Sequence, residues 1–178
     1  MPLGEKRQRP YTVGMDRLPK FLIAAAFALL GIGANPMHAM AAEGHRVYDP
    51  QADAAADMRA ALARVEGTDR RVLVSLGANW CHDSRGLAEH FARPEIAPLL
   101  APFEVVYIDV GGRDRNQDFA EHWGLLDPDT GQQVGTPNLV LVDADGHRLN
   151  SVEDARGWRR ADSKSVEEVA DWLREWAP

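Results

Sequence analysis

The chain contains a single cysteine, and the residues around it are those best suited to chemistry. Cys81 stands in the sequence Trp-Cys-His-Asp-Ser, residues 80–84, just after an apolar run at 71–77 and just before a segment with helical spacing. A cysteine at the start of a helix meets unpaired backbone N–H groups and the positive end of the helix dipole. Both favour the thiolate, which is the nucleophilic form. We therefore expect Cys81 to be partly ionised near neutral pH.

The neighbours of this cysteine act on its charge in different ways. His82 offers a positive partner for the thiolate, whereas the carboxylate of Asp83 disfavours a second anion nearby. Ser84, three residues after the cysteine, is placed to hydrogen-bond the thiolate. Trp80 precedes a cysteine that we expect to be exposed, and it is expected to line a substrate groove. Cys81, Ser84 and His82 are thus the predicted catalytic residues.

A single thiol limits the reaction that this protein can complete. Cys81 can attack a substrate disulfide and form a mixed disulfide, but release then needs another thiol from the substrate, glutathione or a partner protein. Isomerisation fits this limit, because the substrate's own thiol resolves the intermediate and no net electrons move. We expect no cofactor, and Cys81, His82 and His90 do not show a recognised metal-ligand spacing.

The elements that must position this segment alternate between helix and strand. Strands are predicted by runs of apolar, β-branched and aromatic residues at Arg71–Gly77, Phe103–Val110 and Asn138–Val142. A helix is predicted to start at Asp49–Pro50, an acidic cap followed by proline, and to end at Gly67. A second helix is predicted from about Cys81 to Phe91, and a short one is predicted to be capped by Asn116.

The C-terminal part is expected to close the sheet and add a last helix. Asp145–Gly146 predicts a hairpin turn, followed by a short partner strand at 147–152 and a charged loop at 153–164. Ser165-Val-Glu-Glu has the form of a capping box and opens the last helix. The loop carries a small basic patch on an acidic protein, expected to be solvated, with partner docking as the alternative: Arg156, Arg159 and Arg160. The order of elements predicts an α/β fold, with a mixed central sheet flanked by helices on both faces.

Two landmarks of this sequence resemble the thioredoxin superfamily. The Trp-Cys segment after the first strand resembles the family's Trp-Cys-x-x-Cys active site. Gly135-Thr136-Pro137, directly before the strand at 138–142, resembles the family's cis-proline loop, which faces the active cysteine. The resemblance covers about residues 50–176 and implies a thioredoxin-like three-layer fold. It also implies that Trp80, Thr136 and Pro137 shape a substrate groove, in which the loop backbone holds an extended substrate strand.

The departures from the family pattern define a monothiol form. Ser84 stands where the resolving cysteine would be, so the motif is Cys-x-x-Ser. Ser75 occupies the place of the buried acid that assists proton transfer in ordinary thioredoxins. The segment Cys-His-Asp-Ser-Arg-Gly-Leu-Ala, residues 81–88, with Phe91 and Leu99, is similar to the monothiol anterior-gradient proteins and to related bacterial thioredoxin-like proteins.

The N-terminal part has the layout of a targeting segment. A basic region precedes an uncharged run of 14 residues, Phe21–Ala34, and then Ala39-Met-Ala41. This layout predicts a secretory signal peptide over residues 1–41, since a membrane-spanning helix needs about 20 apolar residues. A polar linker at 42–49 and one thioredoxin-like domain at 50–178 follow. The protein is therefore expected to be periplasmic or secreted, with membrane attachment only if the leader stays uncleaved.

Charge restricts the partners of the mature protein. The chain has 20 basic and 27 acidic residues; removing residues 1–41 takes away five basic and two acidic ones and leaves a net charge of −10. Such a surface repels phosphate backbones, so no nucleic acid is expected as a partner.

Exported client proteins or glutathione are expected to form the mixed disulfide. The sequence thus predicts an exported thiol–disulfide isomerase or reductase that needs an external resolving thiol. Two alternatives stay open: a non-catalytic binding or chaperone-like module, and a redox-sensing thiol protein.

Overall fold

The computed structural model describes residues 47–178, so the predicted leader and most of the predicted linker lie outside the described residues. The elements, in chain order, are α2 (Ala54–Val65), β1 (Arg71–Gly77), α3 (His82–Ala92), the 3₁₀-helix η1 (Ala97–Leu100), β2 (Phe103–Asp109), α4 (Gln117–His122), β3 (Asn138–Val142), α5 (Val152–Arg156), the 3₁₀-helix η2 (Gly157–Ser163) and α6 (Val166–Glu175). None of the helices in 47–178 has the length and apolar character needed to span a bilayer.

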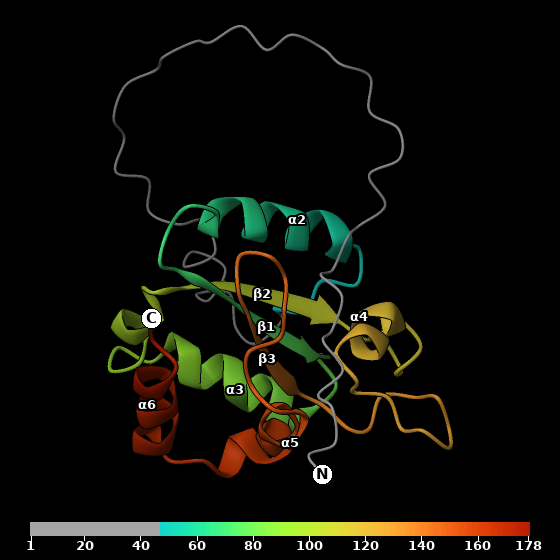
Figure 1. Ribbon diagram of the computed structural model, residues 1–178. Coiled ribbons are helices and arrows are strands. Elements are labelled where there is room, and N and C mark those ends of the chain that lie inside the picture. Colours follow the sequence, from blue (N-terminus) through green and yellow to red (C-terminus); the bar gives the residue numbers. More distant parts are fainter. Residues whose placement is uncertain (1–46) are drawn as a thin grey trace, which may run out of the picture.

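The sheet has three strands in the order β2-β1-β3, with β1 in the middle. β1 pairs in parallel with β2, from Arg71 opposite Phe103 to Gly77 opposite Asp109, and antiparallel with β3, from Val72 opposite Val142 to Leu76 opposite Asn138. Helix α2 covers one face of the sheet, and α3 and α6 lie on the other (Figure 1). The predicted α/β three-layer fold with a mixed sheet is thereby confirmed.

Both faces of the central strand are buried, which explains its nearly continuous apolar sequence. Val72, Val74 and Leu76 face the core that α2, α4 and α5 cover. Leu73, between them, faces a second core formed with α3, η2 and α6. Because side chains alternate across a strand, every apolar residue of β1 meets a covered face, and the cysteine loop that follows starts from a rigid support.

The first described helix begins later than predicted. Its N-cap is Asp53, whose carboxylate accepts from the Ala56 N–H, and α2 starts at Ala54. The prediction of a helix start at Asp49–Pro50 is wrong because the Asp49 carboxylate accepts from the Gln51 N–H, only two residues on, and this closes a turn instead.

The predicted partner strand at 147–152 is also wrong, because only an isolated bridge joins Val142 and Arg148. The side chain of Asn150 takes the place of a strand. Its Oδ1 accepts from the Leu141 N–H at 3.0 Å, and its Nδ2 donates to the Leu139 carbonyl at 2.9 Å. A buried amide thus satisfies backbone groups of β3 that a neighbouring strand would otherwise pair.

Most of the segment predicted as a charged loop, 153–164, is helical as α5 and η2. Ser151 caps α5 by accepting from the Asp154 N–H, and Trp158 and Ala161 of η2 are buried in the core against α3 and α6. The charged residues of this segment therefore lie between apolar anchors. The capping box at Ser165 is confirmed, with both of its reciprocal hydrogen bonds present.

Candidate active site

Cys81 occupies the N-cap position of α3, as predicted. Its N–H donates to the Ala78 carbonyl and its carbonyl accepts from the Arg85 N–H, each at 3.1 Å. Cys81 is only 8% exposed, so the expectation of an exposed cysteine is wrong. The reason is tertiary, because the loop before β3 lies against the sulfur.

That loop brings Thr136 and Pro137 to the cysteine. The Thr136–Pro137 peptide bond is cis, and the Cys81 thiol Sγ donates to the Thr136 carbonyl oxygen at 3.4 Å. Gly135 turns the chain into this position with a φ of 72°, a conformation that residues with a side chain rarely adopt. Residues 55 positions apart in the sequence therefore form one site.

Ser84 is fully buried, but its hydroxyl serves the backbone. Its Oγ accepts from the Ala78 N–H at 3.3 Å, and its carbonyl oxygen lies 3.5 Å from the Tyr48 hydroxyl. The expected bond from Ser84 to the cysteine sulfur is not among the contacts of the described residues. Ser84 instead holds the cysteine loop to the start of α3.

His82 does not pair with the thiol. Its side chain is 70% exposed, and its Nε2 lies 3.3 Å from Asp83 Oδ2 and 3.4 Å from Asp162 Oδ2. Asp83 is buried, and its Oδ1 accepts from the Asp162 N–H at 3.3 Å. Burial and the neighbouring Asp162 carboxyl raise the pKa of Asp83. The imidazole therefore faces two carboxyl groups, which explains why it is not available to the sulfur.

Two groups of the described residues place three possible metal ligands within 4.8 Å of one another: His82, Asp83 and Asp162, and Asp143, Asp145 and His147. In the second group, the Asp143 carboxylate accepts from the backbone N–H groups of Asp145 and His147 and closes the turn at Gly146. In the first, Asp83 is already bonded to the backbone of Asp162. Hydrogen bonds within each group account for its geometry without an ion.

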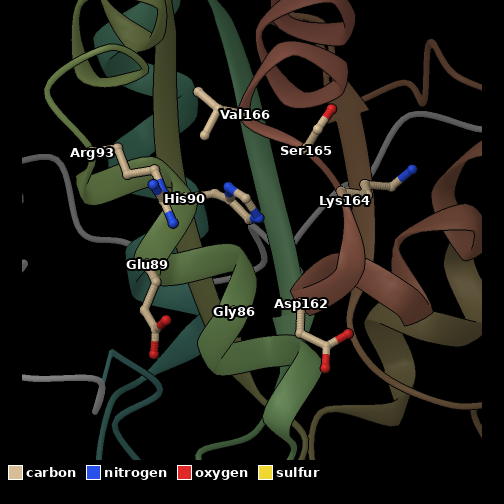
Figure 2. Close-up of a pocket in the computed structure, with 8 residues that line it drawn as sticks. All are labelled: Gly86, Glu89, His90, Arg93, Asp162, Lys164, Ser165 and Val166. Carbon is tan, nitrogen blue, oxygen red and sulfur yellow. The ribbon is translucent and has the colours of Figure 1, made fainter.

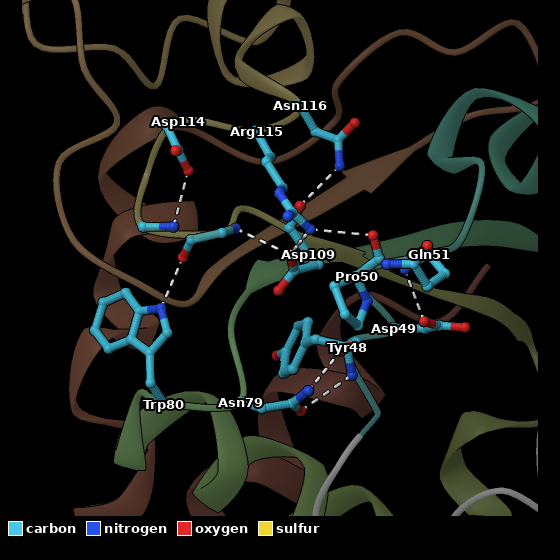
Figure 3. A network of polar contacts seen from close by, with 12 residues as sticks. Tyr48, Asp49, Pro50, Gln51, Asn79, Trp80, Asp109, Asp114, Arg115 and Asn116 are labelled. Atoms are coloured by element: carbon cyan, nitrogen blue, oxygen red, sulfur yellow. Dashed lines mark hydrogen bonds and ion pairs between the residues drawn. The ribbon is translucent and has the colours of Figure 1, made fainter.

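Trp80 is the most exposed large apolar side chain of the described residues, at 55%. Its indole Nε1 donates to the Gly111 carbonyl at 2.7 Å (Figure 3). The guanidinium of Arg113 lies 5.8 Å from the Trp80 ring centroid. Asn79, just before it, exchanges two hydrogen bonds with the backbone of Tyr48. The cysteine loop is thus tied to two distant segments, while more than half of the Trp80 side chain stays exposed.

The segment after β2 is organised by Asp109 at the end of that strand. Its carboxylate accepts from the Gly111 N–H and lies 3.6 Å from the Arg115 guanidinium (Figure 3). Asn116 has the N-cap position of α4, but its side chain donates to the Asp109 carbonyl instead of capping the helix. These contacts hold the Gly111 carbonyl in the position where it accepts the hydrogen bond from Trp80 Nε1.

Tyr48 is a site residue that the sequence analysis missed. Its hydroxyl lies 2.8 Å from Ser75 Oγ, and its ring meets Tyr107 edge-on at 5.4 Å between centroids. Burial raises the pKa of Tyr48, so the phenol stays neutral. Tyr48 falls in the predicted linker, where no periodicity marks it. Ser75, whose place the resemblance assigns to a buried acid, is fully buried and bonded to this phenol.

A pocket of about 310 Å³ lies beside α3 but does not include the cysteine. It is lined by residues of α3 and of the 162–166 segment, with His90 between them (Figure 2). His90 is 6% exposed, and its Nδ1 has no hydrogen-bond partner. Burial, followed by the positive charge of Arg93, lowers the pKa of His90.

Comparisons with known proteins identify this arrangement. A family model described as thioredoxin-like matches residues 53–144, which include Cys81, Thr136 and Pro137. Among solved structures, the chain is similar to a disulphide isomerase from Xylella fastidiosa Temecula1, with 34% identity and a TM-score of 0.63, over 72% of this chain and 94% of that one. The comparison with curated proteins gives no match. On the family match and this similarity, the chain belongs to the thioredoxin-like family.

Proposed function

We propose that this protein is an exported monothiol member of its family and that Cys81 carries out thiol–disulfide exchange on exported proteins. The observation that carries the proposal is the position of Cys81 at the N-terminus of α3, with its sulfur 3.4 Å from the carbonyl oxygen of the cis-proline loop. The similarity to a solved disulphide isomerase supports the same reaction class.

The reaction begins with attack of the Cys81 thiolate on one sulfur of a substrate disulfide. A new S–S bond forms between Cys81 and that sulfur, the substrate S–S bond breaks, and the second sulfur leaves as a thiolate that takes a proton from solvent. Cys81 attacks from the N-cap position of α3, where the first backbone N–H groups have no partner within the helix. The thiol proton is released to solvent when the Cys81 thiolate forms.

The second step needs a thiolate that the protein does not supply, because Cys81 is its only cysteine. In isomerisation, another thiolate of the same substrate attacks the mixed disulfide, the Cys81 thiolate is restored, and no net electrons move. In reduction, a glutathione thiolate attacks the Cys81 sulfur of the mixed disulfide and the substrate leaves as its second thiolate. A second glutathione thiolate then attacks the glutathione sulfur of the new mixed disulfide, which releases the Cys81 thiolate and forms oxidised glutathione. Isomerisation is the simpler cycle for a monothiol protein, since the client carries its own resolving thiol.

The other predicted site residues take supporting roles in this proposal. The exposed face of Trp80 and the loop at Thr136 and Pro137 form the walls against which an extended client segment lies. Ser84 keeps the cysteine loop in place through the Ala78 N–H. His82 lies beside the helix start against the carboxyl groups of Asp83 and Asp162.

Capture of the mixed disulfide tests the proposal. The full-length protein, with its leader, is produced in a bacterial host, purified from the periplasmic fraction and mixed with a peptide disulfide, and adducts are measured by mass spectrometry. We expect one adduct on the wild type and none on Cys81→Ser. Ser84→Cys supplies a resolving thiol and should release the peptide with an internal disulfide, whereas Ser84→Ala, its matched control, should keep the adduct. A wild-type protein that forms no adduct would contradict the proposed disulfide exchange.

The low exposure of Cys81 favours a second candidate function, a binding or chaperone-like module that uses the groove without turnover. Recovery of activity from a protein with scrambled disulfides, in a glutathione buffer, separates the two. The isomerase accelerates recovery and Cys81→Ala abolishes the effect. A binding module would hold the client equally well with Cys81→Ala.

Export is proposed from the leader sequence alone. The intact mass of the protein recovered from the periplasm tests it, because cleavage after Ala41 removes residues 1–41. Recovery of an uncleaved chain in the membrane fraction would contradict the soluble exported form.

A further inference from the structure

An arginine side chain lies directly against the loop that faces the thiol. Gly135 has no room for a side chain, because a β-carbon there would lie 2.4 Å from Cδ of Arg159. The next residue is Thr136, whose carbonyl oxygen receives the bond from Cys81 Sγ. The stem of Arg159 therefore packs on Gly135, the residue before the one whose carbonyl oxygen contacts the reacting sulfur. The buried Nε of Arg159 has no hydrogen-bond partner.

A second arginine, Arg113, lies against the residue that precedes the cysteine. Arg113 is exposed and its guanidinium stacks 5.8 Å from the ring centroid of Trp80, the residue just before the cysteine. It takes a positive φ of 76° in the segment whose Gly111 carbonyl receives the Trp80 indole N–H. The cation–π contact with Trp80 thus holds Arg113 next to the cysteine loop.

Together with Arg156, these residues form one group, here named the arginine cluster: Arg113, Arg156 and Arg159. The three charges are close enough that Arg156 and Arg113, after burial, lower the pKa of Arg159. Within residues 47–178, none of the three forms an ion pair with a carboxylate. Arg156 lies within electrostatic reach of the Asp127 carboxylate, whereas Arg113 and Arg159 are next to the residues that flank the thiol. A mature protein with ten excess negative charges therefore carries a concentration of positive charge near its only thiol.

We infer that the arginine cluster is a substrate subsite that binds a carboxylate side chain, so that the protein prefers disulfides flanked by aspartate or glutamate. This inference rests on the proposed function, since it names the substrate class of the same site. Guanidinium groups bind carboxylates through paired N–H donors. Arg156 and Arg159 are partly buried, and ion pairs with partly buried groups are screened less by salt than pairs between fully exposed ones.

The binding test uses protein that cannot exchange disulfides. Cys81→Ala protein is titrated with fluorescent peptides in which serine replaces the substrate cysteine, flanked by glutamate, glutamine or lysine. We expect the glutamate peptide to bind about threefold to tenfold more tightly than the glutamine peptide at low ionic strength, and the lysine peptide most weakly. The preference should shrink as salt is added. Equal binding of the three peptides, or no binding of the glutamate peptide, overturns the inference.

Variants assign the preference to the cluster. Arg113→Gln, at an exposed position, should abolish most of it, and Arg159→Gln should do the same. Arg160→Gln is the matched control, because it removes the same charge from an exposed arginine next to Arg159 that is not in the cluster. If Arg160→Gln reduces the preference for the glutamate peptide as much as Arg113→Gln does, the preference reflects only the net charge of the protein. That result would overturn the subsite.

Exchange kinetics separate this inference from the proposed function. Wild-type protein is mixed with the cysteine-containing counterparts of the three peptides, each joined to glutathione as a mixed disulfide, and release of the peptide thiol is followed. Equal rates for all three would leave disulfide exchange standing and overturn the subsite. Release no faster than with Cys81→Ala would remove the proposed function, while the binding titration would still decide the subsite.

Discussion

The hydroxyl groups of Tyr48 and Ser75 meet 2.8 Å apart in the interior, next to the cysteine loop. Both residues are fully buried, and the Tyr48 hydroxyl also lies 3.5 Å from the Ser84 carbonyl oxygen. Inside a protein, a hydroxyl that loses its partner keeps the cost of its desolvation. The Tyr48 phenol therefore affects the cysteine loop through packing and hydrogen bonding, and not through a change in its own protonation.

We predict that Tyr48→Phe and Ser75→Ala each lower the free energy of unfolding by about 1 to 2 kcal/mol, because each leaves the other hydroxyl without its partner. The double variant should lose less than the sum, since it removes both members of the pair. Urea unfolding of the four proteins measures this coupling. Tyr107→Phe, which removes a hydroxyl that has no hydrogen bond among the described residues, serves as the control. Strictly additive losses would contradict the pairing.

At the scale of elements, α6 depends on its first turn. The Glu168 N–H donates to Ser165 Oγ at 3.1 Å, and the Ser165 N–H donates to the Glu168 carboxylate at 2.7 Å. Hydrogen bonds to the Glu168 carboxylate from the backbone and the side chain of Ser165 lower the pKa of Glu168. Val169 and Leu173 then bury the apolar face of the helix against the core shared with α3. The cap thus sets where α6 begins, and with it which residues face that core.

We predict that Ser165→Ala lowers the free energy of unfolding by about 1 kcal/mol, because it removes a capping acceptor. Ser165→Thr, which keeps the hydroxyl, should lose much less. Ser163→Ala is the matched control, since Ser163 is exposed and donates only to the Arg160 carbonyl. Chemical denaturation checks the order of the three. A loss with Ser163→Ala as large as that with Ser165→Ala would show that the cap is not responsible.

Elements with strong local signals were predictable, and those without them were not. β1, the start of α3 at Cys81 and the capping box follow from runs of apolar residues and from caps within a few positions. The partner strand at 147–152 failed because a turn sequence shows only where the chain reverses. Whether a strand follows depends on which groups pair with the backbone of β3, and here the Asn150 side chain bonds to the Leu141 N–H and the Leu139 carbonyl.

At the scale of the whole molecule, burial of ionisable groups links stability to pH. Burial and Arg93 lower the pKa of His90, and burial and His147 lower that of His122. Unfolded histidines titrate near about 6.5. As pH falls through that value, the unfolded chain takes up protons before the folded one does, so unfolding becomes easier. Asp83 has the opposite sign, because its raised pKa favours the folded state as the solution becomes more acidic.

We therefore predict that the urea midpoint falls as pH is lowered from about 7.5 to about 5.5, in the histidine range. His90→Gln should flatten this dependence, because it removes one of the two groups responsible. Midpoints at several pH values, for the wild type and the variant, provide the measurement. A wild-type midpoint that stays constant or rises over this range would contradict the assignment.

The sequence by itself determined the helix, strand and loop that carry Cys81, Thr136 and Pro137, and the absence of a second thiol. Caps, chain breakers and apolar runs act over a few residues, so they can be recognised without the fold. Only the tertiary structure decided how enclosed the sulfur is, that His82 faces carboxyl groups, that Tyr48 bonds to Ser75 and that Arg159 packs on Gly135. Each of these depends on residues brought together from distant parts of the chain, and a local pattern does not specify which side chains will meet across a closed core.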